Sequence, residues 1–131
     1  MKAKAVIMIL GLAVTTLFIS CKNGDGKIVG KWQHILTIGN SNIGSDTLDM
    51  TQYPPLFNTF RQDSTLFITN GQKEVNVRYF IRDSSLYSYL LGAEDTSIMK
   101  IKKLTNKELI LEVSIGDGSQ RKENLYYERK D

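Results

Sequence analysis

The ten residues from Lys73 to Arg82, KEVNVRYFIR, decide the class of fold. One side of an extended chain would carry Val75, Val77, Tyr79 and Ile81. The alternate positions are mostly charged or polar, and such alternation is typical of a strand with one buried face. Asn70-Gly71 precedes the stretch and is the strongest short hairpin signal in the chain. The sequence therefore predicts a strand that begins at a hairpin.

Similar segments recur on both sides of this strand, with turn signals about every 8–12 residues, which is the spacing of all-β barrels and sandwiches. The predicted strands are 28–38, 56–62, 65–69, 73–82, 86–91, 96–104, 108–115 and 121–130. A polar stretch, 39–49, is expected to form part of a long loop that runs to Pro55. About eight strands in up-and-down order close most simply into an antiparallel barrel, because closure removes exposed edges. We therefore expect an all-β barrel of about eight strands.

The N-terminus has the pattern of an exported protein. Lys2 and Lys4 precede an apolar run from Ala5 to Ile19, which ends at Ser20-Cys21. A positive start, an apolar core of this length and a small residue before the cut are typical of a cleaved signal peptide. The segment 17–21, LFISC, resembles a bacterial lipobox, which implies that Cys21 is acylated with fatty chains such as palmitate. Acylation would also explain why an exported protein carries a single cysteine, which has no second cysteine to pair with.

The predicted organisation is a signal peptide over residues 1–20, a lipidated tether over 21–27 and a barrel domain over 28–131. Removal of the signal takes away Lys2 and Lys4 and leaves 15 basic against 14 acidic side chains. A nearly neutral domain has no basic field for nucleic acid, so we expect no nucleic-acid partner. The membrane is the expected partner, through acylated Cys21, and several acyl chains make such an anchor stable.

Short motifs at both ends of the domain resemble the lipocalin superfamily. Gly30-Lys31-Trp32 opens the first strand, residues 104–109 read LTNKEL, and Tyr127-Glu128-Arg129 ends the last strand. This layout is similar to lipocalin-like domain lipoproteins of Bacteroidetes-type bacteria, and it covers the whole chain after the signal. The resemblance implies a lipocalin-like barrel in which Trp32 plugs the closed end, Arg129 lies across its indole and Gly30 makes room beside it. It also implies an outer-membrane anchor, with periplasmic and surface display both open.

The candidate ligand-binding residues are those that the strand pattern turns inward. His34, the only histidine, and Leu36 share the parity of Trp32. The full candidate set is His34, Leu36, Phe60, Tyr79, Leu111 and Tyr127. No cluster of Cys, His and carboxylates has metal-ligand spacing and no catalytic motif is present, so we expect no metal, no cofactor and no enzymatic activity.

Two functions remain open from the sequence. An eight-stranded barrel is just wide enough to hold one small ligand or to be filled by side chains. In the first case the chain is a membrane-anchored protein that binds a small apolar or amphipathic molecule in its barrel. In the second it is an interaction or structural lipoprotein, an accessory subunit or an inhibitor, which contacts another envelope protein through an outer face of the barrel or through the segment 39–55.

Overall fold

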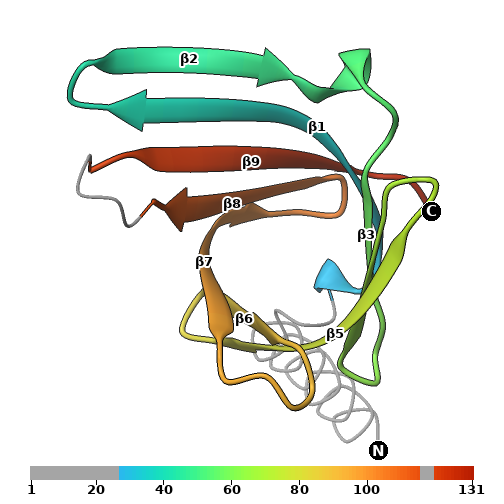
Figure 1. Cartoon of the computed structure of the whole chain (residues 1–131). Helices are drawn as coiled ribbons and strands as arrows, with labels where there is room; N and C mark the ends of the chain where they lie inside the picture. The colour runs from blue at the N-terminus through green and yellow to red at the C-terminus, as the bar shows by residue number, and fades with distance from the viewer. Residues whose placement is uncertain (1–26, 116–119) are drawn as a thin grey trace, which may run out of the picture.

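The computed structural model describes residues 27–115 and 120–131, so the predicted signal peptide and Cys21 lie outside the described residues. Nine strands form one antiparallel sheet (Figure 1). They are β1 (Gly30–Ser41), β2 (Gly44–Asp49), β3 (Phe57–Phe60), β4 (Thr65–Thr69), β5 (Glu74–Arg82), β6 (Ser85–Tyr89), β7 (Thr96–Leu104), β8 (Glu108–Ser114) and β9 (Lys122–Arg129). A short 3-10 helix, η1 (Met50–Gln52), follows β2. No helix in the described ranges is long and apolar enough to cross a membrane.

Strand β1 closes the sheet into a barrel. Its first half pairs with β3, from Gly30 opposite Phe60 to Gln33 opposite Phe57. Its other edge pairs with β9, which returns from β8. The eight strands β1 and β3 to β9 therefore form a closed antiparallel barrel, and the predicted fold class is confirmed. We call the end where β1 begins and β9 ends the closed end, and the opposite end the open end.

Strand β2 is an addition that the sequence analysis did not predict. The polar stretch 39–49, expected to be a loop, instead forms a hairpin in which β2 pairs with the second half of β1. Every residue of β2 is exposed, so burial supplies no alternating pattern to reveal it. The strand forms because β1 extends beyond the end of β3. The rest of this edge of β1 would otherwise leave its backbone N–H and C=O groups without partners. Figure 1 shows this hairpin extending beyond the barrel beside β9.

The hydrophobic core fills the closed half of the barrel. Its buried members are Ile28, Trp32, Phe60, Leu66, Val77, Tyr79, Leu86, Leu109, Leu111 and Tyr127. Four of these side chains are aromatic, and the rings of Phe60 and Tyr79 meet edge to face with centres 5.0 Å apart. Alternation along each strand turns these residues inward, as the pattern of Lys73 to Arg82 predicts.

A β-bulge in β1 reverses the direction of the side chains that follow it. The pairing of β1 with β9 passes from His34 opposite Tyr127 to Leu36 opposite Tyr126, so Ile35 is the extra residue. Directly opposed residues share a face, and Tyr127 is buried inside the barrel. Leu36 therefore lies on the outer face with Tyr126, and its predicted place in the barrel interior is wrong. Thr37 takes the inward direction instead.

Candidate functional site

The closed end is sealed by Arg129 and Trp32. The guanidinium carbon of Arg129 lies 4.4 Å from the centre of the Trp32 ring. Arg129 also donates hydrogen bonds to the backbone oxygens of Lys27, Val29 and Asn106. The indole N–H of Trp32 donates to the oxygen of Ile28 at 2.8 Å. These contacts join both ends of the domain to the β7–β8 turn and bury Trp32 completely. A depression of about 700 Å³ lies outside this seal, lined by Asn106, Lys107, Glu108, Glu128, Arg129 and Asp131.

Gly30 makes room for Arg129, whereas the sequence analysis expected it to make room for the indole. A Cβ built on Gly30 would lie 2.2 Å from Nη1 of Arg129. Its φ of +139° is also a conformation that side chains strongly disfavour. Glycine at this position is therefore required both by the backbone and by the guanidinium that crosses it.

Four of the predicted ligand-binding residues belong to the packed core. Phe60, Tyr79, Leu111 and Tyr127 are between 0% and 6% exposed. The Tyr79 hydroxyl donates to the oxygen of Arg61 at 2.7 Å. Burial raises the pKa of Tyr127 to about 12, against the effect of a hydrogen bond with the Asn58 side chain. These side chains fill the closed half and form a floor above which a ligand could sit.

Inward-facing side chains in the open half of the barrel are less buried than those of the core. Inward-facing residues there, which we call the cup, are His34 and Thr37 of β1, Ile68 of β4, Val75 of β5, Ser88 of β6, Ser97 of β7 and Glu123 of β9. Ile68 is 37% exposed and Val75 is 43% exposed although both point inward, because nothing covers them. A depression of about 300 Å³ lies beside Ile68 near the β6–β7 turn and does not extend to His34, Thr37 or Glu123. It is lined by Ile68, Val77, Ser88, Tyr89, Leu90, Asp95, Thr96 and Ser97.

The β1 and β9 side of the cup carries polar groups, next to the inward-facing Val113 of β8. The half-buried ring of His34 stacks on Tyr127 with centres 4.9 Å apart, and its Nε2 lies 2.9 Å from Oγ1 of Thr37. Burial lowers the pKa of His34, although a backbone hydrogen bond at Leu36 and the Glu123 carboxylate act in the opposite direction. His34 is therefore mainly neutral at pH 7 and can offer one donor and one acceptor.

An ion-pair network borders the β1 and β9 side of the cup. Arg121 lies 3.0 Å from Asp46 and 3.3 Å from Glu123, so it joins β2 to β9 across β1. Its guanidinium crosses Gly39, where a Cβ would approach Nη2 to 2.2 Å. The cup thus combines an apolar wall with a wall that carries hydrogen-bonding groups and one carboxylate. Such a pairing suits a small molecule with one apolar and one polar part.

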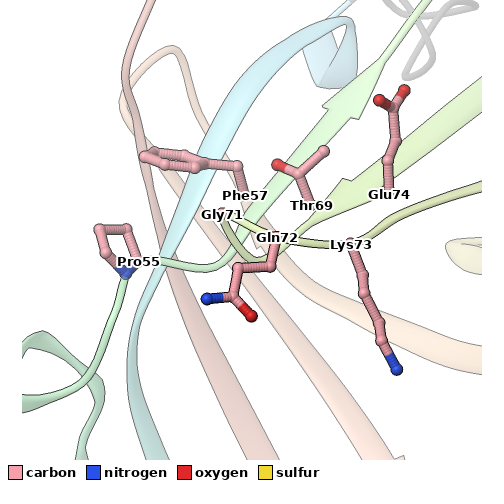
Figure 2. A pocket seen from close by; sticks show the side chains of 7 residues that line it. All are labelled: Pro55, Phe57, Thr69, Gly71, Gln72, Lys73 and Glu74. Carbon is pink, nitrogen blue, oxygen red and sulfur yellow. The ribbon is translucent and has the colours of Figure 1, made fainter.

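A second depression lies on the outer surface. This groove has a volume of about 350 Å³. Figure 2 shows the residues that line it, which are Pro55, Phe57, Thr69, Gly71, Gln72, Lys73 and Glu74. The side chains of Lys73 and Glu74 point in opposite directions, so the polar groups do not converge (Figure 2). The Nζ of Lys31 also lies 4.3 Å from the centre of the Phe57 ring. We therefore regard the cup as the better candidate site.

Of the predicted ligand-binding residues, only His34 lines the cup. Sequence reasoning missed Thr37, because the bulge reverses the parity, and it missed Glu123 on β9. It could have found Val75, which alternates with Val77 and stands beside the Asn70-Gly71 turn that marks the open end. In residues 27–115 and 120–131, no three His, Cys, Asp or Glu residues are placed to hold a metal ion.

Comparisons with known proteins support the fold. No protein-family model and no curated protein sequence matches the chain. The crystal structure of a lipocalin-like protein from Bacteroides uniformis aligns with a TM-score of 0.56 at 15% identity, over 79% of this chain and 99% of that one. A deswapped triple mutant of bovine odorant binding protein aligns with a TM-score of 0.44 at 12% identity, over 79% and 74%. The alignment with the Bacteroides uniformis protein shows that the fold of the chain is lipocalin-like.

Proposed function

We propose that this chain is a membrane-anchored binding protein that holds a small apolar or amphipathic molecule in the cup. The observation that carries the proposal is the uncovered apolar wall inside the barrel, where Ile68 and Val75 face inward and remain more than a third exposed. Inward apolar surface that the protein leaves uncovered gains stability when an apolar molecule removes it from water. The anchor would be acylated Cys21, the only cysteine of the chain.

The proposed role is binding, without catalysis. The only histidine, His34, makes a short contact with Thr37, and burial lowers its pKa. In that position it can orient the polar part of a ligand. We propose the outer membrane as the site of the anchor, with the barrel on either its periplasmic or its outer side.

Native mass spectrometry of the protein, purified gently from its native host, tests the proposal. We expect a copurifying molecule of a few hundred daltons, or its uptake from a cell-envelope lipid extract. Val75→Asp should remove this adduct, because it places a charge on the apolar wall. Ile98→Asp is the matched control, since Ile98 is a similarly exposed strand residue on the outer face. A bare mass under all conditions, or equal loss in both variants, would refute binding in the cup.

A second candidate function is contact with another envelope protein through the β1–β2 hairpin. Ile43, at the tip of this hairpin, is 95% exposed, and Tyr53 beyond η1 is 52% exposed. Exposed apolar residues on a projecting element often contribute to recognition. Cross-linking in intact cells would reveal such a partner, and I43S with Y53S should abolish its capture while ligand uptake persists.

A further inference from the structure

The outer wall of the barrel carries an aromatic and basic surface that runs from Arg82, beside the β5–β6 turn at the closed end, to Tyr89 at the end of β6. We call it the β5–β7 patch, and it consists of Phe80 and Arg82 on β5, Tyr87 and Tyr89 on β6, and Ile98 and Lys100 on β7. Strand register places all six on the outer face. The Phe80 and Tyr87 rings stack with centres 4.7 Å apart and an interplanar angle of 5°. Phe80 is 38% exposed and Ile98 is 56% exposed.

The charges of this patch favour an anionic surface. The guanidinium carbon of Arg82 lies 5.7 Å from the centre of the Phe80 ring, where the arginine stays available to a partner. Lys100 is opposite Glu112 across β7 and β8, but Glu112 pairs with Lys102 at 3.7 Å. Aromatic rings between basic side chains are typical of surfaces that rest in the headgroup layer of a membrane.

The β6–β7 turn at the open end also exposes an apolar side chain, but the charges of this turn are unfavourable for the same contact. Leu91 is 76% exposed in the β6–β7 turn, and Glu94 and Asp95 follow it in that turn. These carboxylates would be repelled by anionic headgroups. The β6–β7 turn is therefore less suited to an anionic surface than the β5–β7 patch is.

The reach of the tether selects between the two ends. Strand directions place the start of β1 and the β5–β6 turn at the same, closed end, because each neighbour in the antiparallel order reverses direction. Six residues lead from Cys21 to Lys27, which spans at most about 20 Å. An acyl anchor on Cys21 would thus hold the closed end near the lipid. We propose that the β5–β7 patch lies on an anionic membrane surface and that the cup opens away from it. This inference rests on the proposed acylation of Cys21.

Fluorescence quenching on vesicles tests this orientation. The acylated protein would carry a thiol-reactive environment-sensitive dye through I98C or through I43C, since an acylated Cys21 leaves no other thiol. Vesicles would contain phosphatidylcholine alone or with phosphatidylglycerol, and a quencher on the lipid headgroups. We expect strong quenching of the dye at position 98, little at position 43, and dependence on phosphatidylglycerol. Salt at about 1 M, where the Debye length falls to about 3 Å, should weaken the quenching of the dye at position 98.

Charge variants provide the second arm of the test. Arg82→Gln with Lys100→Gln should reduce the ratio of docked to undocked protein by roughly 25-fold, since each basic group near an anionic surface contributes about fivefold. The matched control, Lys73→Gln with Lys122→Gln, removes two exposed charges at the open end and should change little. Equal quenching at positions 98 and 43, or stronger quenching at 43, would overturn the orientation while flotation with the vesicles still supports the anchor. An unmodified Cys21 in the mass spectrum would overturn both the proposed orientation and the proposed acyl anchor.

Discussion

The contact between Gly30 and Arg129 makes a quantitative prediction. Gly30→Ala should destabilise the barrel for two reasons that can be separated. The first is backbone strain at a φ of +139°, worth about 1–3 kcal/mol. The second is displacement of the Arg129 guanidinium, whose Nη1 would lie 2.2 Å from the new Cβ. Loss of its bonds to backbone oxygens and of its contact with Trp32 should add about 2–3 kcal/mol. We expect a total of about 4 kcal/mol.

Gly71→Ala is the matched control for strain alone. Gly71 also has a positive φ, +91°, but nothing lies within 4 Å of the site of its Cβ. Its substitution should therefore cost only about 1–2 kcal/mol. The difference between the two variants isolates the displacement of Arg129. In an Arg129→Ala background, Gly30→Ala should cost only the backbone strain of about 1–3 kcal/mol, because the guanidinium is no longer present and the exposed Asp131 carboxylate, 2.8 Å from the new Cβ, can move aside.

Equilibrium denaturation in urea measures these free energies of unfolding. Fluorescence of Trp32, the only tryptophan, reports the closed end, and circular dichroism reports the whole sheet. The double-mutant cycle of Gly30→Ala with Arg129→Ala should give an interaction energy of about 2–3 kcal/mol. Equal costs for Gly30→Ala and Gly71→Ala, or an interaction energy near zero, would show that the guanidinium does not pack over Gly30.

Three further predictions concern the open end and the response to pH. Gly39→Ala should cost less than about 1 kcal/mol in the same urea assay, because the half-exposed Arg121 can move aside; a cost near that of Gly30→Ala would contradict this. Folding raises the pKa of Tyr127 from about 10 to about 12, because burial favours the neutral phenol. The free energy of unfolding should therefore fall as pH rises from about 10 to about 12, by up to about 2–3 kcal/mol. Tyr127→Phe should lack this loss, and parallel alkaline curves would refute it. Folding lowers the pKa of His34, so stability should decline as pH falls through 6.5, and His34→Gln should remove that part of a pH titration of thermal unfolding; an unchanged profile would count against it.

The barrel could be predicted from the sequence because its local signals agree with its closed topology. The alternation in β5 sends Val77 and Tyr79 into the core. Asn70-Gly71 and Asp83-Ser84 both stand at tight turns, where Gly71, Asp83 and Ser84 have positive φ angles. Turn chemistry and strand period therefore fix which segments pair and in which direction.

The candidate site was harder to predict, because it depends on one extra residue in β1 and on the volumes of the side chains that face the barrel interior. The bulge at Ile35 has no local signature, yet it exchanges Leu36 for Thr37 on the inner face. Strand β2 is exposed throughout and exists because β1 offers it an edge. Neither feature appears in the period of hydrophobic residues, which is the signal that sequence reasoning reads best.

The distribution of side-chain volume along the barrel explains why it is half filled. Near the closed end, Trp32, Phe60 and Tyr127 belong to one cluster of buried side chains. Towards the open end, the inner face of β6 and β7 carries Ser88 opposite Ser97, and these small side chains cannot reach across the barrel. Both alternatives for an eight-stranded barrel are thus present in one chain, with an aromatic floor below and an uncovered apolar wall above. A ligand in the cup would rest on the rings of Tyr127 and His34. Its maximum length is therefore set by the depth of the barrel that remains between these rings and the open end.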